Sequence, residues 1–207
     1  MSVTIRTVPC GAYLANAYIV YKEDSSECVL VDPGDDLQAL LKAIGATDRR
    51  LAAIMLTHGH FDHILAAGPL AKETGAQVYI HEGDFEMLAD ESKNAYMTDV
   101  STLPPPRDIL AVEFEDELDV AGMHFEILHT PGHSKGSVCL YMPEEKTMFS
   151  GDTLFQAGVG RMDLFGGSPM QMRSSLRRLF AMDSGIAVYP GHGGFTTIAA
   201  ERTRYNV

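Results

Sequence analysis

Short apolar runs separated by polar turn residues open the chain. These runs are rich in β-branched and aromatic residues, which predicts strands at an antiparallel edge of a sheet: Val3 to Val8, Tyr18 to Tyr21 and Cys28 to Val31. The next apolar residues recur at the i, i+3, i+4, i+7 spacing of one helix face: Leu37, Leu40, Leu41 and Ile44. Gly45 supplies a stop for this helix. The pattern therefore predicts strands followed by an amphipathic helix.

The middle of the chain alternates between strand-like and helix-like segments. Leu51 to Leu56 is an uninterrupted apolar strand, a helix is predicted from His63 to Thr74, and Gln77 to Ile80 is a further strand. This order indicates a buried sheet covered by helices. Ser92 to Asp108 contains three consecutive prolines and little hydrophobic periodicity, so we expect an exposed loop that could overhang a functional site.

The second half repeats the strand-and-helix pattern. Further strands are predicted in four short segments: Phe125 to Leu128, Val138 to Tyr141, Thr147 to Phe149 and Ala187 to Tyr189. One more helix face is marked by four apolar residues: Met172, Leu176, Leu179 and Phe180. The 207 residues suffice for one large α/β domain, and the sequence shows neither an internal repeat of fixed period nor a linker-like stretch. We therefore expect a single domain over residues 1–207.

Composition and charge narrow the class of protein. Hydrophobic residues make up 45% and charged residues 21% of the chain, which is ordinary globular composition. No apolar run approaches the roughly 18 residues of a membrane span, and the first residues show no secretory signal, so a soluble cytoplasmic protein is expected. The net charge of −12 disfavours nucleic acid or an anionic membrane as partner. The three widely spaced cysteines predict neither disulfides nor a thiolate zinc site.

A cluster of imidazoles and a carboxylate follows the apolar strand that ends near Leu56. The cluster consists of His58, His60, Asp62 and His63. Packed together without a partner, these groups would lose solvation and repel one another if charged, whereas a divalent metal compensates both effects. Nitrogen and oxygen donors without sulfur fit zinc, iron or manganese. The alternative interpretation is an accidental histidine cluster on a solvated loop.

Three later residues strengthen the metal hypothesis. His133, Asp152 and His192 each follow a predicted strand and are flanked by glycine, which allows tight turns and close backbone approach. Such loops deliver side chains to one edge of a sheet. The remaining histidines lie outside this pattern and are interpreted as structural: His81, His124 and His129.

These motifs, in their order, resemble the metallo-β-lactamase superfamily and, within it, the small hydroxyacylglutathione hydrolase-like (glyoxalase II type) proteins. The resemblance covers nearly the whole chain and rests on five motifs: Val31-Asp32-Pro33-Gly34, His58 to His63, Thr130-Pro131-Gly132-His133, Ser150-Gly151-Asp152 and Pro190-Gly191-His192-Gly193. It implies a four-layer αβ/βα sandwich and two divalent metal ions, with zinc preferred and iron or manganese as alternatives. By this resemblance His58, His60 and His133 bind one ion. Asp62, His63 and His192 bind the other, and Asp152 bridges both.

The resemblance also implies an activity. A metal-bridged hydroxide would cleave a thioester, most simply an acylated small thiol of the S-lactoylglutathione type, with Asp62 and Asp152 as catalytic residues. Arg161 lies in a Gly-Val-Gly-Arg-Met-Asp stretch also seen in related proteins, and it either binds a substrate carboxylate or pairs with Asp163 to support the metal ligands. Asp32 resembles a carboxylate that orients a metal-bound histidine; its alternative role is a turn or helix cap.

Rival functions remain open at this point. A persulfide dioxygenase of the same superfamily would use one iron at His58, His133 and Asp152, and spacing alone does not separate it from a hydrolase. A non-catalytic metal-binding module is a third hypothesis, while a β-lactamase or a nuclease is less favoured. Full-length glyoxalase II enzymes carry a C-terminal helical domain that supplies much of their glutathione pocket. Here only a short segment follows His192, with Gly194 to Tyr205 expected to form a closing helix, so recognition of glutathione in particular stays open.

Overall fold

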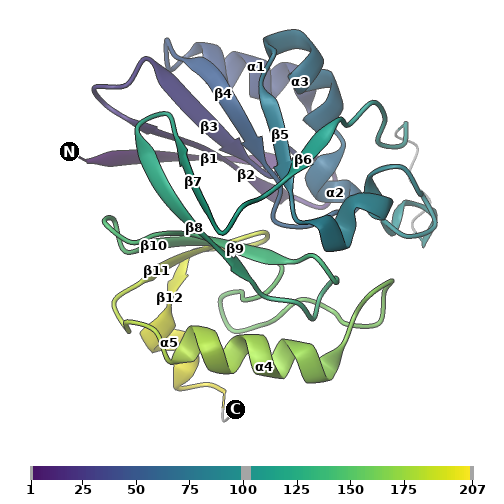
Figure 1. The fold of residues 1–207 in the computed structure, drawn as a ribbon, viewed down its shortest axis with the longest axis vertical. Helices are drawn as coiled ribbons and strands as arrows, with labels where there is room; N and C mark the ends of the chain where they lie inside the picture. Colours follow the sequence, from purple (N-terminus) through teal and green to yellow (C-terminus); the bar gives the residue numbers. More distant parts are fainter. Residues whose placement is uncertain (1, 99–103, 206–207) are drawn as a thin grey trace.

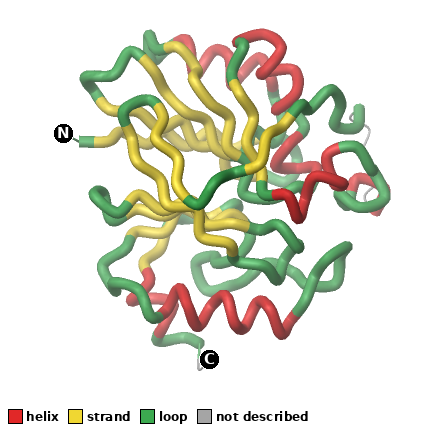
Figure 2. Tube along the Cα trace, viewed as in Figure 1, coloured by secondary structure: helices red, strands yellow, loops and turns green. Residues whose placement is uncertain are grey.

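Two mixed β-sheets face each other, and helices cover their outer surfaces (Figures 1 and 2). The computed structural model describes residues 2–98 and 104–205. The first sheet has, in spatial order, β1 (Val3–Cys10), β2 (Ala15–Lys22), β3 (Glu27–Val31), β4 (Arg50–Met55), β5 (Gln77–Ile80) and β6 (Ala111–Glu113). The second has β12 (Thr196–Thr197), β11 (Ala187–Pro190), β10 (Thr147–Gly151), β9 (Val138–Met142), β8 (Met123–His129) and β7 (Glu117–Val120).

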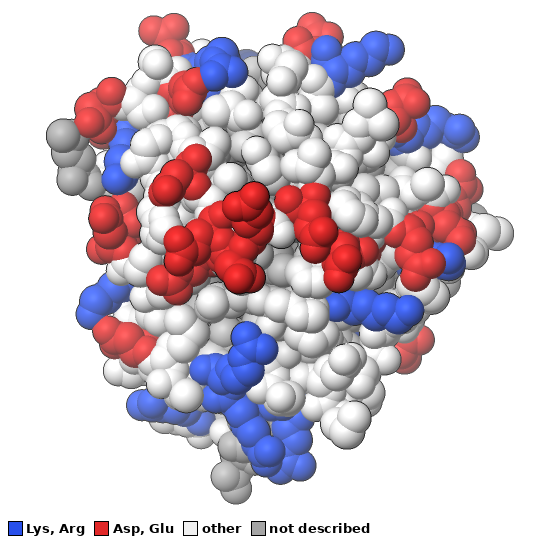
Figure 3. All heavy atoms as spheres, in the orientation of Figure 1, with Lys and Arg blue, Asp and Glu red and all other residues white. Residues whose placement is uncertain are grey.

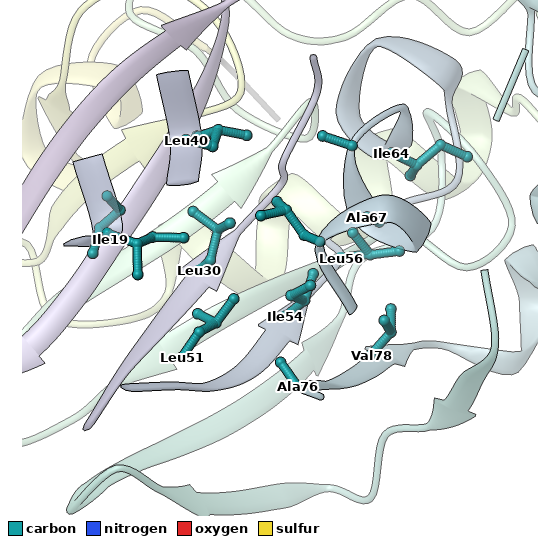
Figure 4. Packing of buried hydrophobic residues seen from close by; sticks show 14 of the residues in the cluster. Ile19, Leu30, Leu40, Leu51, Ile54, Leu56, Ile64, Ala67, Ala76 and Val78 are labelled. Carbon is teal, nitrogen blue, oxygen red and sulfur yellow. The ribbon is translucent and has the colours of Figure 1, made fainter. Parts of the chain in front are cut away.

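Buried apolar residues form three clusters, one between each sheet and the helices that cover it and one between the two sheets. α1 (Leu37–Gly45) and α3 (Ala67–Thr74) pack on the first sheet, where Leu40 meets Ile19 and Leu30 (Figure 4). α4 (Pro169–Phe180) and α5 (Ile198–Arg202) pack on the second sheet. Neighbouring residues of β2 and β3 point alternately to the helix side and to the second sheet, so both faces are buried. The predicted four-layer αβ/βα sandwich is confirmed.

Strand direction places the ends of several strands at one edge. β9 is antiparallel to both β8 and β10, and β10 is parallel to β11, so β8, β10 and β11 run in the same direction. In the first sheet β3, β4 and β5 are parallel to one another. Because parallel strands end at the same edge, the loops after these strands are brought together. The predicted antiparallel pairing of the first three strands is also confirmed.

The predicted helix from His63 to Thr74 is wrong in its continuity. The structure has α2 (Phe61–Ile64) and then α3, which begins at Ala67. A continuous helix would require an N–H from Pro69 to the carbonyl of Leu65, and proline has none. The break puts Pro69 in the first turn of α3, where no such bond is needed, and Ala66 N donates to Pro33 O at 3.0 Å.

Other segments differ from the sequence prediction in detail. β6 and β7 were not predicted, and the Gly194–Tyr205 segment contains the short strand β12 as well as α5. Of the predicted loop Ser92–Asp108, the described part contains a single 3₁₀ turn at Tyr96–Thr98, and residues 99–103 lie outside the described residues. Within the described ranges, none of the helices has the length and apolar character needed to cross a membrane.

Candidate metal centre

The seven predicted ligands come together at the edge where the parallel strands end. The segment after β4 carries His58 and His60, and the short helix α2 that follows carries Asp62 and His63. The other three ligands follow strands of the second sheet: His133 after β8, Asp152 after β10 and His192 after β11. Residues separated by more than a hundred positions in sequence thus face one another across the two sheets.

The first group of candidate ligands contains three buried imidazoles. His58, His60 and His133 are 1%, 3% and 2% exposed, and one nitrogen of each lies within 4.8 Å of the others. His60 Nδ1 approaches His133 Nε2 to 2.7 Å. This is a compact three-nitrogen site of the kind that binds zinc or iron.

The second group contains one carboxylate and two imidazoles. One ligand atom each from Asp62, His63 and His192 lies within 4.8 Å of the others. His63 Nε2 lies 3.2 Å from His192 Nε2, and Asp62 Oδ2 lies 3.4 Å from that same His192 nitrogen. The group is less buried than the first, since His192 and Asp62 are partly exposed.

Asp152 lies between the two groups. Its Oδ1 is 3.4 Å from His63 Nε2, and its Oδ2 is 3.5 Å from His133 Nε2 and 3.8 Å from His192 Nε2. Oδ1 therefore faces the second group, while Oδ2 approaches one histidine of each group, and this position between the groups fits the expected bridging role.

The polar atoms of the centre fit a divalent cation better than they fit one another. Among the described residues, the buried atoms His58 Nε2, His60 Nε2 and Asp152 Oδ1 have no hydrogen-bond partner. Where two imidazole nitrogens face each other, one proton at most can lie between them. Buried polar groups in native proteins are almost always paired, so these unpaired atoms indicate a bound group that supplies positive charge. A metal ion meets that requirement.

Burial and neighbouring charges set the protonation of the candidate ligands. Burial, with the neighbouring imidazoles, holds the pKa of His58 and His60 well below the usual range, so both are neutral and able to bind a metal. Burial also acts to lower the pKa of His63, but Asp62, Asp152 and Asp32 outweigh it and raise that pKa. Burial opposes ionisation of Asp62, yet His63 and His192 hold the pKa of Asp62 below its usual range. Asp62 thus stays ionised in the site.

Asp32 supports the ligands from behind. Its carboxylate accepts hydrogen bonds from the Thr57 backbone N–H at 2.7 Å and from Thr57 Oγ1 at 2.6 Å. Its Oδ2 lies 3.2 Å from His63 Nδ1, and Thr57 Oγ1 lies 3.0 Å from His58 Nδ1. These contacts fix ring orientation in both groups, as expected of a carboxylate that orients metal-bound histidines, and not of a helix cap.

Arg161 shows features of both roles that the sequence left open. Its Nε and Nη2 donate to the two carboxylate oxygens of Asp163 at 2.7 and 2.8 Å. Its backbone carbonyl accepts a hydrogen bond from His133 Nδ1 at 2.7 Å, so the main chain at this position supports a ligand. The side chain meanwhile lines the pocket beside the centre.

That pocket has a volume of about 450 Å³ and opens over the candidate ligands. Its floor includes His60, His133 and His192 with both Asp62 and Asp152. Its walls are mostly aromatic and aliphatic, namely Tyr13, Phe61, Ala95, Phe155 and Leu164. The Ser92–Asp108 loop was expected to overhang the site, and among its described residues Ala95 lines the pocket. The pocket combines an apolar wall with convergent polar groups, which is typical of a small-molecule site.

Sequence reasoning missed one buried residue of the centre, Asp84. It is 0% exposed and accepts hydrogen bonds from the two loops that carry His58, His60 and His133. A signal was present, because Asp84 follows β5, a strand parallel to β4 whose end lies at the same edge. The leftover histidines lie elsewhere: His81 stacks on His129 with ring centroids 4.1 Å apart, and His124 lies 2.9 Å from Asp119.

Comparison with known proteins agrees with this geometry. The model of the metallo-beta-lactamase superfamily matches residues 10–192. The chain is 33% identical to hydroxyacylglutathione hydrolase GloC of Haemophilus influenzae, over 96% of this chain and 94% of that protein. Among solved structures, the BLEG-1 B3 metallo-beta-lactamase is 35% identical with a TM-score of 0.87, covering 97% of each chain. TTHA1623 in a di-iron-bound form is 38% identical with a TM-score of 0.84, covering 95% of this chain and 96% of that one. The chain therefore belongs to the metallo-β-lactamase superfamily of metal-dependent hydrolases.

Proposed function

We propose that this protein hydrolyses the thioester of a small acylated thiol, of the S-lactoylglutathione type, with two divalent metal ions. The observation that carries the proposal is the pair of ligand groups joined by Asp152 on the floor of an apolar-walled pocket. The similarity to a hydroxyacylglutathione hydrolase supports the substrate class. Zinc is the preferred metal, with iron and manganese as alternatives, because the donors are nitrogen and oxygen only.

Each group of residues would hold one metal. His58, His60 and His133 would hold the first, Asp62, His63 and His192 would hold the second, and the carboxylate of Asp152 would contact both. When bound, such a pair of ions lowers the pKa of a water molecule to about 7 and polarises a carbonyl oxygen.

The chain's own residues orient the reactants. Asp62 is ionised and lies at the pocket floor, so its carboxylate can accept a hydrogen bond from the attacking water and hold it in line with the thioester carbonyl. Tyr13, Phe61 and Phe155 give an apolar wall that packs on the acyl or thiol part and limits the access of bulk water. No protein nucleophile is needed, and the three cysteines are buried and absent from the lining of the pocket.

A small neutral or weakly charged substrate suits the surface charge better than a polyanion does. The net charge is −12, and acidic side chains gather across the middle of the face seen in Figure 3, while basic ones lie around its edges and toward the α4 end. A nucleic acid or an anionic membrane would be repelled by most of this surface. We therefore propose a small-molecule substrate and neither of those partners.

The experiment measures thiol release from a panel of thioesters by the metal-loaded protein. S-lactoylglutathione and a neutral acyl thioester of N-acetylcysteamine form the main arms, and His60→Ala and chelator-treated protein are the controls. Release of free thiol that is lost in both controls would support the proposal. Absence of thiol release from every thioester at full metal load would overturn it.

Two further arms test rival chemistries in the same preparation. A chromogenic β-lactam is included because a structural neighbour is described as a B3 metallo-beta-lactamase. Glutathione persulfide with an oxygen electrode is included because a one-iron persulfide dioxygenase of the same superfamily would use His58, His133 and Asp152. Oxygen consumption without thioester cleavage would favour the dioxygenase.

A further inference from the structure

Asp84 is a buried carboxylate that contacts no candidate ligand directly but touches the loops that carry three of them. Its Oδ2 accepts from the Gly59 backbone N–H at 3.0 Å and from Ser134 Oγ at 2.6 Å. Its Oδ1 accepts from the Gly136 backbone N–H at 2.7 Å. All three hydrogen bonds are buried, so the carboxylate accepts them from protein groups and not from solvent.

These donors adjoin the three-histidine group and not the second group. Gly59 lies between His58 and His60, and Ser134 follows His133 directly. The second group is supported by other atoms, because Asp32 faces His63 Nδ1 and the Tyr13 carbonyl lies 3.2 Å from His192 Nδ1. Asp84 therefore connects the loop after β4 to the loop after β8.

The backbones around Asp84 are packed too closely for the loops to adjust freely. A Cβ placed on Gly136 would lie 2.6 Å from Asp84 N, and one on Gly83 would lie 2.9 Å from Gly136 N. A Cβ on Gly59 would lie 2.7 Å from Met87 Cβ. Since real Cβ atoms do not approach so closely, the glycines allow the two loops to close on a carboxylate of fixed size.

We infer that Asp84 is a positioning residue that sets the separation between the His58/His60 loop and His133, and thereby the metal affinity of the three-histidine site. It acts through the Gly59, Ser134 and Gly136 hydrogen bonds and touches neither metal nor substrate. The inference rests on the proposed metal function of the centre. Asparagine at this position has the same size but turns one acceptor oxygen into an N–H₂ donor that faces an N–H or O–H donor.

The test is a titration of metal-free protein with zinc, in competition with a chelator of known affinity. His60→Ala and Asp62→Ala serve as references that identify the binding step belonging to each group. Asp84→Asn is expected to weaken the three-histidine step by about 10- to 100-fold and to leave the other step unchanged. Ser134→Ala, which removes a single donor to Asp84, is expected to weaken the same step by a smaller factor.

Glu201→Gln is the matched control. Glu201 is also 0% exposed and accepts hydrogen bonds from Ala157 N at 3.0 Å and Thr196 Oγ1 at 2.6 Å. Its substitution is expected to lower the melting temperature and to leave the ratio of the two zinc steps as in the wild type. A general loss of stability is thereby separated from a selective effect on one metal site.

Equal weakening of both steps by Asp84→Asn, or a lower melting temperature with both steps intact, would overturn the positioning role. If Asp84→Asn does not fold, Ser134→Ala decides the question by the same comparison. A wild-type protein that binds no zinc, iron or manganese would instead overturn the metal centre itself. The titration uses no substrate, so failure of the thioester assay does not affect its outcome.

Discussion

Replacement of Arg161 by alanine is expected to lower kcat/KM for the thioester while metal content and melting temperature stay unchanged. The structure separates the two parts of this residue. The backbone carbonyl that accepts from His133 Nδ1 is retained in the variant, whereas the guanidinium, on a side chain 62% exposed, is lost. The support of the ligand should therefore survive and only a contact to substrate should disappear.

The size of the effect follows from which donors remain. The Nε and Nη2 atoms of Arg161 each donate one N–H to Asp163, so one edge of the guanidinium is occupied and the Nη1/Nη2 end is the part that can reach a substrate carboxylate. Loss of one charge-assisted contact corresponds to about a 10- to 150-fold fall in kcat/KM. Arg161→Lys keeps the charge without the planar fork, so an intermediate loss is expected.

The assay records kcat/KM on the thioester that proves active, together with metal content and melting temperature, for Arg161→Ala, Arg161→Lys and the wild type. A substrate without a carboxylate provides the control, because the variants should cleave it as well as the wild type does. Loss of metal or of stability in Arg161→Ala would show that the side chain supports the ligands, and the substrate role would then be refuted.

Three other outcomes are expected. Asp152→Ala should lose activity and metal together, because its carboxylate would neutralise two neighbouring cations, while His129→Ala should retain both. Metal-to-protein ratios measure this, and full metal retention by Asp152→Ala contradicts the bridging role. Asp32→Asn should weaken metal affinity by about 10- to 100-fold in a chelator competition, since asparagine tolerates the φ of 47° at this position but alters the contact with His63. An unchanged affinity would argue against that support. Zinc at about a hundred times its Kd should stabilise the folded protein by about 2.7 kcal/mol, and a chelator should reverse this stabilisation. A melting temperature that changes with neither zinc nor chelator would be inconsistent with a metal site.

The fold was predictable where the burial of a segment leaves a simple pattern of apolar residues in its sequence. β2 and β3 are apolar on both faces because helices cover one side and the second sheet covers the other, so their sequences read as continuous apolar strands. α4 is marked by its apolar face and by Ser168, whose side chain accepts from Gln171 N at its start. The metal motifs were predictable because histidine and aspartate rarely cluster after strands without a cation.

The remainder depends on tertiary contacts that a local pattern does not contain. β6 spans Ala111–Glu113, is largely exposed and is too short to show a period, whereas β7 carried a weak signal in the alternation of Leu118 and Val120 with acidic residues. Asp84 stands between two other acidic residues, Glu82 and Glu86, and its role becomes visible only when the loops after β4 and β8 close on it. The break before α3 could have been expected from Pro69.

The most direct test of the central claim is thiol release from the best thioester as zinc, iron or manganese is added stepwise to metal-free protein. Activity is predicted to rise steeply as the second equivalent of metal binds, because Asp62, His63 and His192 must be loaded in addition to the three-histidine group. Maximal turnover with a single equivalent of iron, accompanied by oxygen consumption on glutathione persulfide and no thiol release, would contradict the account.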